Sequence, residues 1–316
     1  ANSGTLDPQT IIEEKKHIIR KSGVLQFYDV DRDMDSVGGL GNLKKWLDQR
    51  RNSFSDEAKA YGLPNPRGVL IVGIPGTGKS LVSKCIGHDW NMPVLRMDVG
   101  SLFGSLVGQS EANMRKALKT AETLAPCVLW IDELEKSLGS PTGASDGGTT
   151  ARVFGSFLSW MQEKTTPVFV VATANDVSAL PPEMLRKGRF DELFFVDLPD
   201  EEDRKDIINI HLDRYGRAGL SSDDLESLTG STDGFSGAEL EQVVIDGMYK
   251  AFPEGREPES EDYVLSAKNT VPLSATMGAK IEGLRLWADG RAVLANGAST
   301  RVEVRKSKRP RRRIMN

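Results

Sequence analysis

The residues best suited to chemistry lie at 73–80, which read GIPGTGKS. Glycines at 73, 76 and 78 let the backbone curl, so that successive N–H groups point inward at phosphate oxygens. Lys79 can reach the β- and γ-phosphates of a nucleotide, and the Ser80 hydroxyl can ligate Mg²⁺. The apolar run 69–72 precedes the loop and a helix-like run follows it, which is the order that a phosphate-binding loop needs. A plain glycine turn with a surface lysine is the alternative, and the flanking patterns disfavour it.

Two further polar groups follow apolar runs that read as buried parallel strands. Residues 128–131 end at Asp132 and Glu133, and the run 168–172 is followed closely by Asn175. Ligands bind at the carboxyl ends of parallel strands, so we expect Asp132 to hold Mg²⁺ opposite Ser80. Glu133 would then polarise the water that attacks the γ-phosphate. Asn175 can orient that water or contact the γ-phosphate, although an Asn-Asp pair also forms ordinary turns.

Arg186 and Arg189 stand three residues apart, on either side of Lys187 and Gly188. As ordinary surface charges they need no further role. In a closed ring with heterologous contacts, such arginines can reach the nucleotide of the neighbouring subunit. They would then stabilise charge on the transferred phosphoryl group.

The charge of the chain is distributed unevenly. Its 316 residues include 41 basic and 45 acidic ones, a formal net charge of −4. Residues 301–316 hold eight Lys or Arg and one Glu, which leaves 33 basic and 44 acidic residues elsewhere, a net of −11. The basic tail can touch nucleic acid or can simply be solvated and disordered. The acidic body argues against a dedicated nucleic-acid-binding protein.

Other features exclude several classes of protein. The sequence has no run of 18 apolar residues, so we expect no membrane span. Cys85 and Cys127 are expected to be core thiols in a reducing compartment. Three well-separated histidines argue against a zinc site, and the lack of an H-E-x-x-H pattern excludes a built-in zinc protease. Because the chain begins with alanine rather than methionine, we expect a truncated or processed N-terminus.

The pattern along the chain predicts an α/β fold. Strand-like and helix-like segments alternate over 31–199, which predicts a parallel five-stranded sheet sandwiched by helices. The expected strands are 68–72, 93–98, 126–131, 167–172 and 193–197, and the expected helices are 40–50, 79–89, 110–123, 150–163 and 181–186. Only helical segments follow, at 201–214, 221–228, 236–252, 258–269 and 273–288, which predicts a small all-α lid domain over 200–288. Residues 1–30 are expected to be a linker or a remnant of an N-terminal region, and 289–316 a basic, disordered tail.

These motifs together resemble the AAA+ ATPases of the AAA subgroup, which includes FtsH-type proteases and Cdc-forty-eight-type unfoldases. The resemblance covers roughly residues 31–270, and GIPGTGKS and VLWIDE resemble its Walker A and Walker B segments. Asn175 falls at the sensor-one position, and Arg186 and Arg189 match the arginine-finger pair. The resemblance implies a P-loop NTPase fold that binds ATP or ADP with Mg²⁺.

The resemblance also implies the surroundings of the nucleotide. The segment DSVGGL is similar to the family's entry loop, where Val37 and Gly38 would frame adenine. His211 resembles the lid histidine, and GFSGAEL places Gly237 and Ala238 at the sensor-two position. The implied nucleotide-binding residues are Val37, Gly38, Pro75, Gly76, Thr77, Gly78, Lys79, Ser80, Leu81, Asp132, His211, Gly237 and Ala238. The implied metal ligands are Ser80 and Asp132, and the implied catalytic residues are Lys79, Glu133, Asn175, Arg186 and Arg189.

Longer segments resemble the small AAA proteins of cyanobacteria and algal plastids, the hypothetical chloroplast reading frame type. Members of that group carry a longer N-terminal region. Leu106 and Val107 align with the central-pore loop, where many unfoldases have an aromatic residue that grips polypeptide. Alternatively, they pack at the start of a helix. The Gly/Ser/Thr-rich segment 139–149 would supply a second pore loop.

We therefore expect a Mg²⁺-dependent ATPase that forms a nucleotide-dependent homo-oligomeric ring, as a hexamer, and remodels or threads a protein or peptide substrate. The resemblance places it in the cytoplasm or plastid stroma. One alternative is a nucleic-acid-directed AAA+ motor, supported by the basic tail alone. Another is a nucleotide-gated scaffold, against which Glu133 and the arginine pair argue.

Overall fold

The computed structural model describes residue 19 and residues 23–29, 32–98, 100–102, 109–138 and 149–297. Three expectations lie outside these residues. They concern Leu106 and Val107 of the expected pore loop, nearly all of the segment 139–149, and the basic tail at 301–316.

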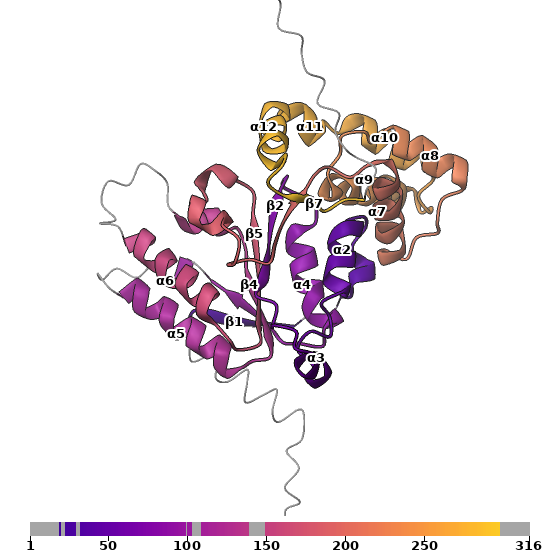
Figure 1. The fold of residues 1–316 in the computed structure, drawn as a ribbon. Coiled ribbons are helices and arrows are strands. Elements are labelled where there is room, and N and C mark those ends of the chain that lie inside the picture. Colours follow the sequence, from indigo (N-terminus) through magenta and orange to yellow (C-terminus); the bar gives the residue numbers. More distant parts are fainter. Residues whose placement is uncertain are drawn as a thin grey trace, which may run out of the picture.

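A seven-stranded sheet forms the centre of the molecule (Figure 1). Its order is β1-β3-β4-β5-β2-β6-β7, and every neighbouring pair except β1–β3 is parallel. The five predicted strands are confirmed as β2 (Gly68–Gly73), β3 (Val94–Met97), β4 (Cys127–Ile131), β5 (Val168–Ala174) and β6 (Glu192–Val196). β2, β4 and β5 are buried along their whole length, which explains their continuous apolar sequences.

Two edge strands were not predicted. β1 (Leu25–Tyr28) pairs antiparallel with β3, so part of the expected 1–30 linker belongs to the sheet. β7 (Val293–Leu294) pairs with β6, so the expectation of a disordered tail at 289–316 is wrong for residues 289–297. A strand of two residues is too short to show a period-two pattern, and β1 lies at the edge of the sheet, where it pairs with β3 alone.

Helices cover both faces of the sheet, as predicted (Figure 1). α5 (Gln109–Thr123) and α6 (Thr149–Glu163) contribute Leu118 and Phe157 to the core on one face. α2 (Gly41–Asp48) and α4 (Lys79–Asp89) contribute Leu43 and Ile86 to the core on the other face.

Two short elements differ from the prediction for this domain. The helix expected at 181–186 is a 3-10 turn, Pro182–Leu185. A further helix, α3 (Asp56–Tyr61), lies in a segment where none was predicted. Ser55 caps it, because its hydroxyl accepts a hydrogen bond from the Ala58 N–H at 3.2 Å.

The predicted helical segments that follow β6 form a lid with its own core. The lid consists of α7 (Glu201–Arg214), α8 (Ser222–Gly230), α9 (Gly237–Ala251) and α10 (Ser260–Asn269). Its core includes Ile208, Leu228, Leu240, Val244 and Tyr263. A capping box at Ser236 and Glu239 satisfies backbone donors at the start of α9, which explains why the helix begins at Gly237.

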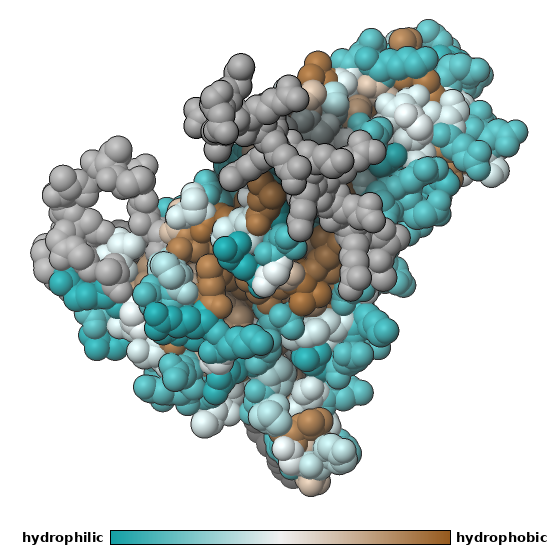
Figure 2. All heavy atoms as spheres, turned by 45° about the horizontal axis from the view of Figure 1, so that its top comes forward, coloured by the Kyte–Doolittle hydropathy of each residue, from teal (hydrophilic) through white to brown (hydrophobic). Residues whose placement is uncertain are grey.

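The last predicted helix is divided in two and leaves the lid. α11 (Leu273–Thr276) is followed by α12 (Gly278–Ala288), whose Ile281 and Leu284 lie in the same core cluster as Leu180 and Phe195 of the α/β domain. The expected lid domain over 200–288 therefore ends before α12, because the apolar face of α12 packs on the α/β domain. Figure 2 looks onto this side of the molecule, where hydrophilic residues cover most of the lid and hydrophobic ones gather near the centre. Within the described residues, we find no helix long and apolar enough to cross a bilayer.

Candidate active site

The loop between β2 and α4 lines a cleft of about 530 Å³ between the sheet and the lid. At its start, Gly73 has φ +151°, and a Cβ on this residue would lie 2.1 Å from the Val196 carbonyl oxygen of β6. At its centre, Gly76 has φ +76°. Only glycine fits both constraints, so the spacing of glycines reflects the close approach of β6 and the tight curl of the loop.

Lys79 lies buried inside this loop, with only 5 % of its surface exposed. Its Nζ donates hydrogen bonds to the carbonyls of Gly73 at 3.0 Å and Ile74 at 2.6 Å. Burial lowers the pKa of Lys79 to about 8, while the carboxylates of Glu135, Asp132 and Glu133 act in the opposite direction. The Lys79 ammonium group is thus poorly solvated. Phosphate oxygens of a nucleotide can replace the two carbonyl groups as its hydrogen-bond acceptors.

Asp132 follows β4 and joins two hydroxyl groups. Its Oδ1 accepts hydrogen bonds from Ser80 Oγ at 2.8 Å and from Thr173 Oγ1 at 2.6 Å. A hydroxyl and a carboxylate at the end of a phosphate loop form an oxygen donor set that suits Mg²⁺, which completes its shell with water and phosphate. Within the described residues we find no cluster of three or more His, Cys, Asp or Glu that could hold a metal.

Glu133 is held in an unusual backbone conformation, with φ +50°. Its N–H donates to Thr173 Oγ1 at 3.1 Å, which ties it to the neighbouring strand β5. Its carboxylate accepts from Asn175 Nδ2 at 3.4 Å and pairs with Lys136 Nζ at 2.6 Å. The structure thus brings the two expected catalytic side chains, Glu133 and Asn175, into contact on the wall of the cleft.

Glu135 supports this arrangement from behind. Its Oε1 accepts the Asn175 N–H at 2.9 Å, while its Oε2 is buried and has no hydrogen-bond partner among the described residues. Sequence reasoning missed Glu135, Lys136 and Thr173. Their positions near the ends of β4 and β5 were the available signal, because the sheet brings those two ends together.

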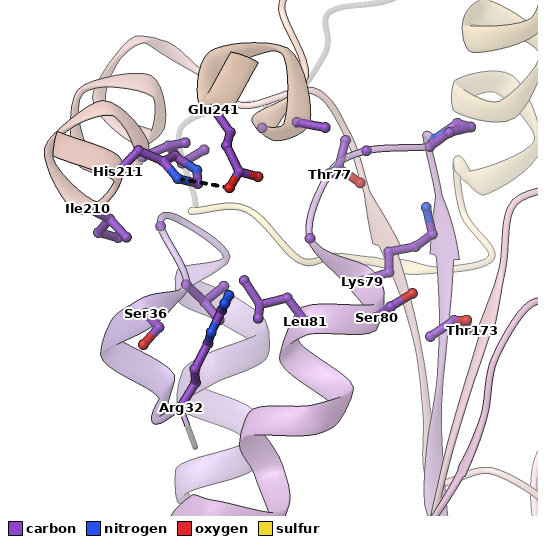
Figure 3. Close-up of a pocket in the computed structure, with 18 of the residues that line it drawn as sticks. Arg32, Ser36, Thr77, Lys79, Ser80, Leu81, Thr173, Ile210, His211 and Glu241 are labelled. Carbon is purple, nitrogen blue, oxygen red and sulfur yellow. Dashed lines mark ion pairs between the residues drawn. The ribbon is translucent and has the colours of Figure 1, made fainter. Parts of the chain in front are cut away.

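The far end of the cleft is built by the entry loop and the lid (Figure 3). A Cβ on Gly38 would lie 2.4 Å from Ile207 Cγ1 of α7, so the entry loop and the lid are in close contact there. His211 points from α7 toward Glu241 of α9, with 3.8 Å between His211 Nδ1 and Glu241 Oε1. Burial lowers the pKa of His211, against the opposing effect of the Glu241 carboxylate. Arg32, which sequence reasoning missed, also lines this end of the cleft.

Glu241 is fixed by two further partners. Its Oε1 accepts hydrogen bonds from Arg214 Nη1 at 2.7 Å and from the Tyr215 hydroxyl at 3.0 Å. The lid also contacts the phosphate end, because the Ala238 N–H donates to the Gly76 carbonyl at 2.9 Å.

The cleft contains every residue expected to bind nucleotide or metal, together with Glu133 and Asn175. In chain order these are Val37, Gly38, Pro75, Gly76, Thr77, Gly78, Lys79, Ser80, Leu81, Asp132, Glu133, Asn175, His211, Gly237 and Ala238.

Arg186 and Arg189 do not line this cleft. Arg186 is exposed, and the Arg189 side chain donates to the carbonyl of Glu183. Gly188 lies between them, and its backbone carbonyl accepts a hydrogen bond from the Arg67 side chain. The pair is therefore presented on a structured surface turn, away from the cleft of its own chain.

Comparisons with known proteins find AAA proteins among those similar to this chain. The model of the "ATPase family associated with various cellular activities (AAA)" matches residues 69–198. The "Uncharacterized AAA domain-containing protein ycf46" of Pyropia yezoensis is 49 % identical over 283 residues, 89 % of this chain and 58 % of the relative. The Guillardia theta protein of the same name is 48 % identical over 278 residues, 88 % of this chain and 55 % of the relative. This chain thus spans little more than half the length of these relatives.

More distant proteins share less of the chain. The "Cell division cycle protein 48 homolog" of Archaeoglobus fulgidus is 30 % identical over 214 residues, 66 % of this chain and 29 % of that protein. A solved structure, "Crystal structure of FIGL-1 AAA domain", superposes with a TM-score of 0.70 at 22 % identity, covering 91 % of this chain and 99 % of that one. At that identity the structural likeness concerns the fold alone.

Proposed function

Because the chain belongs to the AAA family of ATPases, we propose that it binds ATP with Mg²⁺ in the cleft and hydrolyses it to ADP and phosphate. The observation that carries the proposal is the contact of Ser80 Oγ with Asp132 Oδ1 at 2.8 Å, beside the buried ammonium of Lys79. These groups bring a metal-ligand pair and a phosphate-binding cation together where the loop at 73–80 meets the end of β4.

Each side chain has a role in the proposed reaction. The loop N–H groups and Lys79 bind the phosphates, and Ser80 and Asp132 hold Mg²⁺, which neutralises charge on the phosphate oxygens. Glu133 accepts a proton from the attacking water. Asn175, hydrogen-bonded to Glu133 at 3.4 Å, orients that water. Val37, Gly38 and His211 enclose the base and ribose end.

We also propose that Arg186 and Arg189 complete the site of a neighbouring subunit in a closed ring, as a hexamer. Arg186 is exposed and Arg189 is partly exposed, and neither lines the cleft of its own chain, which supports this role. A ring in which each subunit contributes arginines to the next requires heterologous contacts that close.

The proposed ring acts on a protein or peptide substrate. Similarity to a Cell division cycle protein 48 homolog favours remodelling or threading of a protein or peptide, with Leu106 and Val107 as pore contacts. The similarity to the ycf46 proteins is consistent with a place in the cytoplasm or plastid stroma. The relatives are longer than this chain, so the proposal concerns only the segment that the chain shares with them.

The first test measures ATP binding, turnover and molar mass together. Lys79→Ala should lose ATP binding, whereas Glu133→Gln should bind ATP, stall hydrolysis and accumulate as a ring. Light scattering of Glu133→Gln with and without ATP–Mg²⁺ should show a shift to about six subunits. Retained affinity in Lys79→Ala would overturn the phosphate-loop assignment. A monomer under both conditions at high concentration would overturn the shared site.

A further inference from the structure

Residues 293–296, here named the C-terminal clasp, return from α12 to the α/β domain. β7 pairs with β6, in the register Phe194 to Val293 and Phe195 to Leu294. The Ala295 N–H then donates to the Phe195 carbonyl at 2.8 Å, and Ala295 is completely buried. The clasp is therefore an integral part of the fold beside the end of β6, the strand that leads into the lid.

Asn296, at the end of the clasp, is 3 % exposed and bonds to three separate elements. Its Nδ2 donates to Asp203 Oδ2 of α7 at 2.8 Å, and its Oδ1 accepts the Asp197 N–H after β6 at 3.3 Å. Its backbone carbonyl accepts from Asn42 Nδ2 of α2 at 2.6 Å. Through its side chain and its backbone carbonyl, Asn296 thus connects the end of β6, the lid and the helix that follows the entry loop.

The lid partner, Asp203, stands where α7 begins. It forms a capping box with Asp200, in which the Asp203 N–H donates to Asp200 Oδ1 at 2.9 Å and the Asp200 N–H to Asp203 Oδ2 at 3.3 Å. The same helix carries Ile207 and His211 to the wall of the nucleotide cleft. Asp203 also packs on the entry loop, because a Cβ on Gly39 would lie 2.5 Å from Asp203 Oδ1. A shift of Asp203 must therefore move one wall of the cleft relative to the other.

The clasp holds the opposite wall as well. The backbone N–H groups of Asn42 and Leu43 both donate to the Ala295 carbonyl, at 3.1 and 3.2 Å. These residues belong to the first turn of α2, directly after the entry loop that contains Val37 and Gly38. The first-turn N–H groups of a helix have no partner within the helix, so the clasp satisfies donors that would otherwise need water.

A second contact from the C-terminal region holds the connection between β6 and the lid. Arg285 of α12 forms a two-pronged ion pair with Asp197, with Nε to Oδ2 at 2.8 Å and Nη2 to Oδ1 at 2.9 Å. Asp197 lies between β6 and the lid. Its backbone N–H is the group that donates to Asn296 Oδ1. Both α12 and the clasp thus bind Asp197, the residue that follows β6 at the connection to the lid.

We propose that Asn296 is a positioning residue for nucleotide binding, which holds α7 and the entry loop at the separation that the base end of the cleft requires. This inference rests on the proposed function, because the wall residues it positions are those assigned to the nucleotide. Asn296 does not line the cleft itself, and it acts through its hydrogen bonds to Asp203, Asp197 and Asn42. Its loss should therefore weaken ATP binding while leaving the chemical step nearly unchanged.

The test compares Asn296→Ala and Asn296→Asp with the exposed control Asn269→Ala, in the full chain, with a fluorescent ATP analogue and Mg²⁺. Losing a hydrogen bond to a charged group should raise the Kd about tenfold in Asn296→Ala. Asn296→Asp should be worse, because it brings a second carboxylate against Asp203. In steady state, the KM for ATP should rise with the Kd while kcat stays within about twofold. Wild-type affinity in both variants would overturn the proposal.

A reciprocal exchange separates positioning from general damage. In Asp203→Asn/Asn296→Asp, an amide and a carboxylate again face each other, so the Kd should return most of the way to the wild-type value. A folded double variant with the affinity of Asn296→Asp would overturn the proposal. The single variant Asp203→Asn controls for the loss of the Asp203 charge, and thermal melting of each variant checks that it is folded.

Hydrogen exchange on the nucleotide-free protein distinguishes failure of this inference from failure of the proposed function. Amides at 200–207 should exchange faster in Asn296→Ala than in the wild type, with no change in Asn269→Ala. If the wild type binds no ATP but amides 200–207 still exchange faster in Asn296→Ala, the proposed function fails, whereas the structural role of Asn296 is supported. If the wild type binds ATP and these amides are unchanged, the clasp does not position the lid.

Discussion

The backbone N–H of Ala238, in the first turn of α9, donates to the carbonyl of Gly76 in the phosphate-binding loop at 2.9 Å. Ser236, which caps the same helix, packs on the same glycine, since its Oγ would lie 3.0 Å from a Cβ placed there. The lid thus contacts the loop through a backbone hydrogen bond and through close packing of Ser236 and Ala238 on Gly76. Movement of α9 must break this hydrogen bond, which couples the lid to the loop that would bind the phosphates.

Removal of the Ala238 donor should therefore weaken nucleotide binding. Ala238→Pro deletes the N–H at the second position of α9, where proline is tolerated because no hydrogen bond within the helix is lost. We expect the Kd for ATP to rise about tenfold, the factor that corresponds to about 1.4 kcal/mol. Asp223→Pro, at the second position of α8 and outside the cleft, is the matched control. Equal affinity in Ala238→Pro and the control would show that this contact contributes nothing.

Lys164 should make stability depend on pH. Burial lowers its pKa to about 8, whereas the ordinary value is 10.5, and its Nζ donates to the Val168 carbonyl at 2.6 Å. Between these two values the unfolded chain binds more protons than the folded one, so the contribution of Lys164 to stability rises with pH across this window.

The variant Lys164→Met removes that desolvated charge. At pH 7 we expect its melting temperature to exceed that of the wild type by about 2 °C or more. The difference should shrink as the pH is raised from 8 toward 10, which thermal melts at several pH values would detect. Lys45→Met, at an exposed position of α2, is the control. A constant difference across the pH range would exclude titration of Lys164 as its cause.

The sequence was sufficient for the parts of the site that lie on consecutive residues. The loop at 73–80 and the pair Asp132 and Glu133 are specified by local backbone needs and by burial of the strands before them. The parallel direction of the five central strands also follows from the alternation of strand and helix along the chain, whereas the place of β2 between β5 and β6 does not.

The missed residues owe their place to tertiary structure. Glu241 and Arg32 are ordinary charged residues in sequence, and only the closure of the lid brings them to one cleft. The same holds for Asn296, which lies 93 residues from its partner Asp203. The two-residue strand before it carries no periodic pattern, because its conformation depends on the edge of β6.

Lys136 should restrain the proposed catalytic base. Its Nζ lies 2.6 Å from Glu133 Oε2, and both side chains are partly exposed. Lys136→Ala frees that carboxylate oxygen, so we expect kcat to rise by up to about fivefold, because exposed ion pairs are worth at most about 1 kcal/mol. The KM for ATP should not change, and Lys136→Arg, which keeps the pair, should behave as the wild type. A tenfold fall in kcat for Lys136→Ala would instead assign the lysine a supporting role in catalysis.

Arg186→Ala and Arg189→Ala should each reduce ATP turnover by about a thousandfold, within the range known for arginines that act on a transferred phosphoryl group. Because neither residue lines its own cleft, the affinity for ATP should stay at the wild-type level. Lys187→Ala, an exposed residue between the two, is the control and should retain turnover.

Mixing of subunits tests whether the site is shared. In an equal mixture of Arg186→Ala and Glu133→Gln subunits, some junctions join an intact Glu133 to an intact neighbouring Arg186. Random assembly gives such junctions at about a quarter of the sites, so activity should exceed that of either variant alone. Mixing Arg186→Ala with the double variant Arg186→Ala/Glu133→Gln creates no such junction and should restore nothing. If the first mixture is equally inactive, although light scattering shows that the subunits co-assemble, the two arginines do not act across a subunit boundary.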